Sequence, residues 1–246
     1  MTANLSSIDE LDSLPPAMAF QSLALMLLAV VAGALAGAIA LPQWLPGLSA
    51  SLLGPSPKAY WYLSRASALV AYGLLWLSMV FGLTLTNKMA RLWPGGPTMF
   101  DLHQHASLLG LAFALFHGLI LTGDRYISYS LGQVLTPFAS VDYRPIWVGL
   151  GQVGFYLLGV VGLSFYVRKA MGARLWRLLH YLSFGVFLLA LAHGLMSGTD
   201  SAAESVKLMY WITGGSVLFL TLQRALVAMK FGKARPEPRL AKKGEN

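Results

Sequence analysis

Six long apolar runs occupy most of this chain and limit its fold more than any other feature. An α-helix needs about 20 mostly apolar residues to cross a bilayer. Only 11% of the residues are charged, whereas a soluble domain carries roughly 25% charge. The sequence therefore predicts an all-α integral membrane protein built as a six-helix transmembrane bundle. The predicted spans cover about 18–41, 61–86, 103–122, 146–167, 175–197 and 208–229.

The segments outside the spans are short. Residues 1–16 contain three acidic and no basic side chains, which predicts an acidic cytoplasmic leader because a secretory signal peptide begins with positive charge. Residues 230–246 are expected to form a basic cytoplasmic tail. Between these segments we expect one membrane domain, residues 17–229, and no separate soluble domain.

Lysine and arginine residues are distributed unevenly across the predicted spans. With six spans, both termini share one side of the membrane with the second and fourth loops. Thirteen basic residues fall on that side and five on the other. Loops rich in basic residues stay in the cytoplasm, so both termini are predicted to be cytoplasmic in a multi-pass protein of the cell (inner) membrane. The five residues of the opposite side are Lys58, Arg65, Arg125, Arg144 and Lys207.

Composition excludes several classes of function. The chain has no cysteine, which excludes disulfides, thiolate zinc sites and all-cysteine iron–sulfur clusters. The net charge is +8, but the basic residues flank the spans and form no single patch, so nucleic acid is not an expected partner. Membrane lipids are expected partners, because residues 230–243 suit anionic headgroups. An acidic cytoplasmic partner is the alternative ligand for this tail, and a topology signal without any ligand is the other alternative.

All five histidines lie in two of the six spans. His103, His105 and His117 are in the third span, and His180 and His193 are in the fifth. Ionisable residues inside a membrane are rare and usually mark functional sites. Histidine is also the obvious ligand for a redox cofactor in a chain without cysteine. The alternative is that these histidines only hydrogen-bond between helices.

The histidine spacing predicts two pairs at two depths in the membrane. His103 and His117 are 14 residues apart and His180 and His193 are 13 apart, which separates each pair by about 20 Å along its helix. Spans three and five both start on the cytoplasmic side. His103 is therefore expected opposite His180 toward the inner leaflet, and His117 opposite His193 toward the outer leaflet. Each facing pair could bind one metal-centred cofactor between the helices, so these four are the predicted metal ligands.

The helical period fits this arrangement better in span three than in span five. Fourteen residues at about 100° each come within about 40° of whole turns, whereas thirteen fall about 140° short. Span five must therefore be kinked, overwound or inclined. Ser183 and Gly185 lie between its histidines, and such residues favour kinks. His105 lies about 120° from the face of His117, so we expect it near the site or the interface, with replacement of His103 as inner ligand as the alternative.

These residues resemble a known family. The run HQHASLLGLAFALFH at 103–117, together with WRLLH at 176–180 and LAHG at 191–194, is similar to the ferric reductase-like transmembrane domain. That family includes NADPH oxidases, ferric-chelate reductases and the haem subunit of bacterial methionine sulfoxide reductase. The resemblance covers about residues 60–200, and its most specific feature is the pair of spacings, 14 and 13.

The resemblance implies transmembrane electron transfer through two stacked b-type haems, each held by two histidines. His103 and His180 would hold the inner haem, and His117 and His193 the outer one. Many relatives carry a C-terminal domain that binds FAD and NADPH, but no Gly-rich nucleotide motif follows the last span here. We therefore expect a haem-binding membrane component of an oxidoreductase, served by a separate flavoprotein or quinol donor and an outer-side acceptor. Flavin would be present only in such a partner.

Two arginines are candidate partners of the anionic haem propionates. Arg177 lies one turn before His180 on the inner side, and Arg65 lies one turn inside span two on the outer side. An arginine inside a membrane needs an anionic partner, which for Arg65 would be a propionate or a substrate. Snorkelling to the interface is the alternative for Arg65, and positive-inside bias is the alternative for Arg177.

Three other functions remain open from the sequence. A transporter usually keeps carboxylates or broken helices near the midplane, and no aspartate or glutamate lies in mid-span here. A membrane scaffold subunit would bind no cofactor. A quinone-linked cytochrome b would bind a single haem.

Overall fold

The computed structural model describes residues 14–53, 58–87, 89, 94–124, 127–141 and 143–233. Within these ranges the chain forms helices and turns and no strand. Six helical segments are long and apolar enough to cross a membrane, which confirms the predicted six-helix bundle. The protein is therefore a multi-pass membrane protein. Its spans are Phe20–Trp44, Ala59–Thr86, Gly96–Gly123, Pro145–Met171, Ala173–Ser197 and Glu204–Val227.

The first span is assembled from consecutive helical pieces. A single π-helical turn interrupts the α-helix, and the Tyr60 hydroxyl of the second span donates a hydrogen bond to the Gly37 carbonyl in that turn at 2.7 Å. Inserted side-chain contacts of this kind commonly accompany a break in the regular helical ladder. The pieces are α2 (Phe20–Leu35), the π-turn (Ala36–Ala40), α3 (Leu41–Trp44) and the short α4 (Pro46–Leu53) that follows.

The second and third spans form an antiparallel pair. Helix α5 covers Ala59–Thr86 and α6 covers Gly96–Ile120, and the two pack together along their length. Gly95, just before α6, has a φ of 107°, a conformation that glycine adopts readily. Pro97 stands in the first turn of α6, where a missing backbone N–H costs nothing. A short 3₁₀ turn, Leu121–Gly123, completes the span.

The fifth span is broken into two helices. Its first piece ends at a histidine and its second begins two residues later, so Tyr181 alone joins them. Gly172, with a φ of 83°, separates the fourth span from the fifth. The elements of this half are α7 (Leu131–Leu135), α8 (Pro145–Met171), α9 (Ala173–His180), α10 (Leu182–Ser197) and α11 (Glu204–Lys233).

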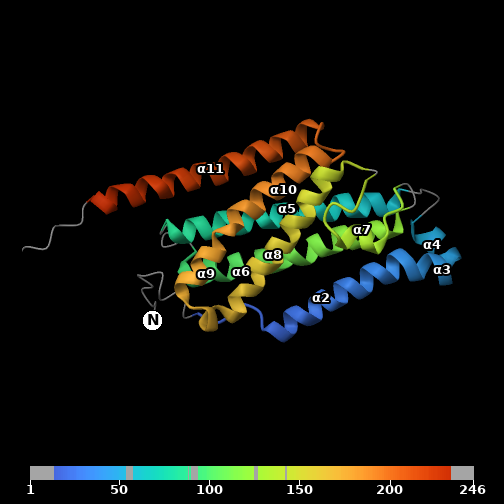
Figure 1. Ribbon diagram of the computed structural model, residues 1–246, viewed down its shortest axis with the longest axis horizontal. Coiled ribbons are helices and arrows are strands. Elements are labelled where there is room, and N and C mark those ends of the chain that lie inside the picture. The colour runs from blue at the N-terminus through green and yellow to red at the C-terminus, as the bar shows by residue number, and fades with distance from the viewer. Residues whose placement is uncertain are drawn as a thin grey trace, which may run out of the picture.

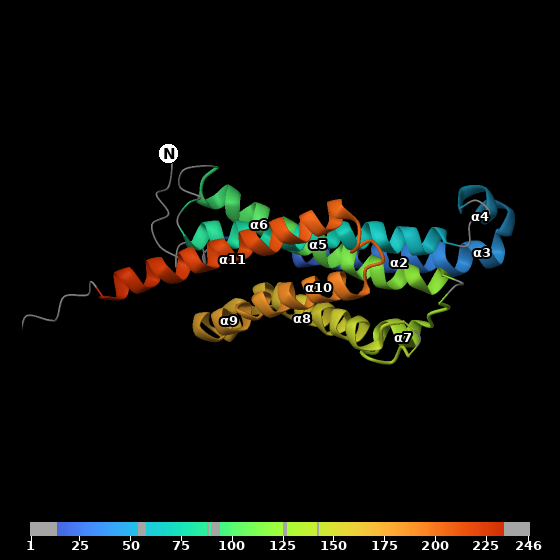
Figure 2. The same ribbon diagram turned by 90° about the horizontal axis from the view of Figure 1, so that it is seen from above.

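The helices are arranged in two layers. Helices α2, α5, α6 and α11 form one layer, and α8, α9 and α10 form the other together with α7 (Figure 1, Figure 2). Across the interface between the layers, α6 contacts α8 and α5 contacts α10. The start of α2 and the end of α11 lie at the end of the bundle that holds α9, and α7 lies at the opposite end.

A packed apolar core fills the middle of the interface between the layers. Tyr72 and Leu75 of α5 pack with Val186 and Phe187 of α10. The Tyr72 and Phe187 rings stack with centroids 5.9 Å apart. The Tyr72 hydroxyl is 2.7 Å from the Thr213 hydroxyl, so its buried oxygen is hydrogen-bonded as buried polar groups require. These side chains hold the two layers together near the middle of the bundle.

The predicted leader, residues 1–16, and tail, residues 230–246, lie mostly outside the described residues, and their boundaries stay predictions. The end of the leader is bound to the helices. Arg168 of α8 donates to the Leu14 carbonyl at 2.6 Å, and the Ala17 N–H donates to the Gln104 side chain of α6 at 3.1 Å. The segment just before α2 therefore bridges the two layers at the α9 end of the bundle.

Candidate functional site

Four of the five histidines face one another as two pairs across the two layers. The ring centroids of His103 on α6 and His180 on α9 are 6.0 Å apart, with an angle of 72° between the rings. Those of His117 on α6 and His193 on α10 are 6.1 Å apart, at 70°. We call these the α9 pair and the α10 pair. The structure thus brings together the same partners that the sequence spacing predicted.

The break in the fifth span allows both of its histidines to face α6. The expected interruption is present, but it lies at Tyr181 and not at Ser183 or Gly185. The Tyr181 carbonyl accepts a 3.2 Å hydrogen bond from the Phe184 N–H. This i→i+3 bond is one turn of the tighter 3₁₀ type. Such a turn changes the rotation between α9 and α10, which accommodates the 13-residue spacing.

Backbone carbonyls fix three of the four imidazoles through Nδ1. The Nδ1–H of His103 donates to the Ser78 carbonyl at 2.8 Å, and that of His117 to the Ser64 carbonyl at 2.9 Å. The Nδ1–H of His193 donates to the Trp147 carbonyl at 2.9 Å. A carbonyl partner at Nδ1 sets the tautomer and leaves Nε2 as the metal-binding nitrogen.

The fourth imidazole is positioned by an aromatic contact. The ring of Trp176, one turn earlier on α9, stacks on the His180 ring with centroids 5.2 Å apart and 28° between the planes. Trp176 in turn makes an edge contact with Phe165 of α8 at 6.4 Å. The guanidinium of Arg168 lies 3.6 Å from the Phe165 ring centroid. Phe165 of α8 therefore supports the His180 ring through its edge contact with Trp176.

The separation within each pair is the one expected when two imidazoles bind one metal from opposite sides. A histidine nitrogen binds a transition metal at about 2 Å, and the ring centroid lies about 1 Å beyond that nitrogen, which places the two centroids about 6 Å apart. The measured distances are 6.0 and 6.1 Å. Among the described residues there is no cluster of three or more His, Cys, Asp or Glu side chains that could hold a bare metal ion. Two nitrogens alone leave a metal under-coordinated, so the remaining ligands would have to come from a cofactor.

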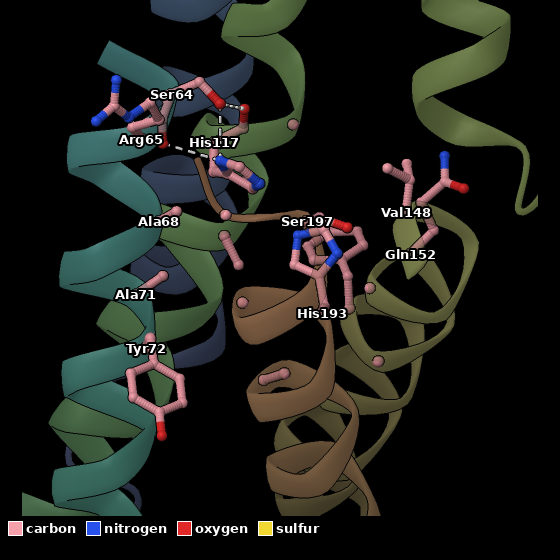
Figure 3. A pocket seen from close by; sticks show the side chains of 18 of the residues that line it. Ser64, Arg65, Ala68, Ala71, Tyr72, His117, Val148, Gln152, His193 and Ser197 are labelled. Atoms are coloured by element: carbon pink, nitrogen blue, oxygen red, sulfur yellow. Dashed lines mark hydrogen bonds between the residues drawn. The ribbon is translucent and has the colours of Figure 1, made fainter. Parts of the chain in front are cut away.

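A mostly apolar cavity of about 260 Å³ surrounds the α10 pair (Figure 3). His117 and His193 project into it from opposite layers. Small side chains of α5, Ala68 and Ala71, leave space along one wall, and Ser197 lies one turn beyond His193. The cavity therefore offers a flat apolar ligand room between the layers beside the two imidazoles.

Two glycines let the backbone approach the imidazoles closely. A Cβ on Gly151 of α8 would lie 2.5 Å from Nδ1 of His193, and a Cβ on Gly82 of α5 would lie 3.3 Å from Cε1 of His103. The first distance is shorter than any non-bonded contact allows, and the second is tight. The glycine-rich sequence of α8 thus provides the space that the His193 ring occupies.

The two predicted arginines differ in their surroundings. Arg65 lines the cavity and forms a two-pronged ion pair with Asp200 of the α10–α11 loop, in which Nε lies 2.7 Å from Oδ2. The anionic partner that Arg65 was expected to need is therefore an aspartate of this chain. Arg177 is an exposed residue of α9, one turn before His180, and does not line the cavity.

We expect Arg65 and Asp200 to stabilise the protein as a pair. Arg65→Ala and Asp200→Ala should each lower the Tm in detergent, and the double variant should lose less than the sum. The coupling should be about 1 kcal/mol, because the side chains are 29% and 35% exposed and water screens them. A double-mutant cycle of thermal unfolding measures this, and strictly additive effects would contradict it.

His105 lies outside the paired arrangement. Its side chain is exposed, and its Nδ1 contacts the Asp101 carbonyl of its own helix at 2.9 Å. His103 faces His180 instead. Of the two candidates for the partner of His180, the structure therefore selects His103.

Side chains of α8, Gln152 and Tyr156, fix the segment around α7 over the cavity. The Gln152 amide donates to the carbonyls of Gln133 and Val134 at 2.7 and 2.8 Å, and its oxygen accepts from the Phe138 N–H at 3.2 Å. Gln133 and Val134 also line the cavity. The segment around α7 therefore closes the cavity at the α7 end.

Sequence reasoning missed the two serines of α5 that contact the α6 histidines. Ser64 and Ser78 are 14 residues apart, the same spacing as His117 and His103. In an antiparallel helix pair a repeated spacing brings two equivalent contacts into register. The matching interval in neighbouring spans was therefore a signal that could have identified both residues.

Comparison with known proteins places the chain in a family. The family model described as "Ferric reductase like transmembrane component" matches residues 67–191, just over half of the chain. The match includes His103, His117 and His180 and ends two residues before His193. Comparisons with curated proteins and with solved structures gave no match. The chain belongs to the family of ferric reductase-like transmembrane components.

Proposed function

We propose that this protein carries electrons across the membrane through two b-type haems, one held by the α9 pair and one by the α10 pair. The observation that carries the proposal is the presence of two opposed histidine pairs with centroids 6.0 and 6.1 Å apart. They lie at two depths of a six-span bundle from a ferric reductase-like family. The hydrogen bonds of His103, His117 and His193 to neighbouring helices use Nδ1 and leave Nε2 available as a ligand atom.

The residues at the α10 pair suit a haem. The cavity is mostly apolar, and the small side chains of Ala68 and Ala71 leave space along one wall, which suits a flat hydrophobic macrocycle. Arg65 lines the cavity, and an anionic propionate there would share its guanidinium with Asp200. Arg177, one turn before His180, is the corresponding candidate at the α9 pair. With only two protein ligands at each pair, a haem supplies the ligands that the chain lacks.

The protein's part in the reaction would be to bind the two haems, to set the distance between them and to surround the path between them with apolar side chains. A bound haem supplies a reversible one-electron change at iron. The two imidazoles of each pair would hold a haem from opposite layers and would leave no place at its metal for a substrate. The apolar core around Tyr72, Val186 and Phe187 lies between the two pairs along the helices. Electrons would therefore cross from one pair to the other through packed apolar protein.

The basic loops suggest which pair receives the electrons. With both termini in the cytoplasm, as positive-inside bias favours, the α9 pair faces the cytoplasmic side and the α10 pair the outer side of the cell (inner) membrane. A separate cytoplasmic flavoprotein or a quinol would reduce the α9 pair's haem. An outer-side acceptor would oxidise the haem of the α10 pair, near the cavity that α7 covers.

The test is the absorption spectrum and the haem-to-protein ratio of the purified protein, expressed with adequate haem. We expect b-type spectra with both haems in six-coordinate form and a ratio of two. A ratio of one would replace the proposal with a single-haem cytochrome b. A colourless protein would overturn it and leave a scaffold or transporter role.

A further inference from the structure

We infer that Ser64 and Ser78 tune the redox potentials of the two haems independently, each through the α6 histidine that it contacts. This inference rests on the proposed function, since it concerns residues that act on the haem ligands. Both serines lie on α5, are buried, and are not ligands themselves. Their role follows from the direction of each hydrogen bond, which the geometry determines.

At the α10 pair, the Ser64 hydroxyl must accept a hydrogen bond from the imidazole. The contact between Nδ1 of His117 and the Ser64 carbonyl, 2.9 Å, requires that Nδ1 carry the proton, because a carbonyl only accepts. The Ser64 hydroxyl proton is directed to the His117 carbonyl at 3.0 Å. The Ser64 oxygen, 2.8 Å from Nδ1, is then left as a second acceptor for the imidazole N–H.

At the α9 pair, two serines produce the same arrangement. Nδ1 of His103 donates to the Ser78 carbonyl at 2.8 Å, and the Ser107 hydroxyl donates to the His103 carbonyl at 2.8 Å. The Ser78 hydroxyl, 2.6 Å from that of Ser107, must therefore donate to it. The Ser78 oxygen again faces the imidazole N–H as an acceptor, at the longer distance of 3.2 Å.

The two arrangements are repeats of one local unit. Ser64 contacts His117 and Ser78 contacts His103, so moving 14 residues forward on α5 corresponds to moving 14 residues back on α6. In each pair, the serine of α5 contacts only the histidine that lies on α6. The partner histidines differ, since His193 donates to the Trp147 carbonyl and His180 stacks on Trp176.

An acceptor on Nδ1–H makes the imidazole a more basic ligand. A more basic ligand stabilises the ferric state over the ferrous state and lowers the potential. Removing the hydroxyl should therefore raise the potential of the haem on that side. Ser64, with the shorter contact, should have the larger effect.

The experiment is a spectroelectrochemical titration of the full-length protein with bound haem, comparing wild type with Ser64→Ala and Ser78→Ala. Each variant should move one component of the two-component titration upward and leave the other in place. The two variants should move different components. A severalfold change in the oxidised-to-reduced ratio is expected for Ser64→Ala, below the tenfold change that corresponds to about 59 mV for one electron, and a smaller change is expected for Ser78→Ala.

Ser164→Ala is the matched control. Ser164 is a buried serine of α8 whose hydroxyl donates to the Val161 carbonyl of its own helix at 2.6 Å, so its removal should leave both components unchanged. Variants that keep two haems but move neither component, or move both equally, would overturn this inference alone. A wild-type protein without haem would instead overturn the proposed function.

Discussion

His117→Ala is expected to remove one of the two proposed haems and to leave the other bound. The substitution deletes the α6 ligand of the α10 pair, while the α9 pair lies about 20 Å away along the helix and keeps both imidazoles. His193→Ala should give the same result from the opposite layer, because its ring is the partner of His117. The measurement is the pyridine haemochrome content per protein, which should fall from two to one.

His105→Ala provides the control within the same helix. Its ring is exposed and contacts only the Asp101 carbonyl of its own turn among the bonds described for it. It should keep both haems, whereas His103→Ala should lose one. Equal losses from these two variants would mean that histidine content, and not the facing geometry, determines haem binding.

Gly151→Ala should disable the α10 pair although position 151 provides no ligand. The new Cβ would lie 2.5 Å from Nδ1 and 2.7 Å from Cγ of His193, so the ring must move. Moving it also breaks the 2.9 Å hydrogen bond to the Trp147 carbonyl. We expect loss of one haem, as in His193→Ala, measured by haem content and by the ratio of the two titration components.

Gly159→Ala is the matched control on α8, because a Cβ there meets nothing within 4 Å. It should keep both haems and gain about 0.5–1 kcal/mol, since alanine is the better helix residue. Gly82→Ala should lose part of one haem, at the α9 pair, because its Cβ would lie 3.3 Å from Cε1 of His103. Full haem content in Gly151→Ala would show that the α10 site is looser than the structure indicates.

Much of the fold could be predicted from the sequence because the membrane imposes simple rules. Span length and apolar content were sufficient for six helices, and the histidine spacing was sufficient for the two facing pairs. The break in span five also followed from arithmetic, since thirteen residues do not complete whole turns. Its position at Tyr181 did not, because the packing of α9 against α8, including the edge contact between Trp176 and Phe165, is a tertiary effect.

Contacts between distant segments could not be predicted. Asp200 is 135 residues from Arg65 and lies in a loop, so no helical period relates them. The choice of His103 over His105 depended on the face that α6 turns toward the second layer. The fit of His193 against Gly151 depended on how closely α8 and α10 pack.

The arrangement of the pairs across two layers also bears on how the protein is made. Each histidine pair draws one ring from each layer, and every helix satisfies its own backbone in the lipid. The helices of each layer can therefore form on their own. A metal bound by one ring from each layer would then cross-link the two layers. Ligand binding to the folded state adds stability with ligand concentration. The supply of haem would then set how far the folded state is stabilised beyond what the apolar core between the layers provides.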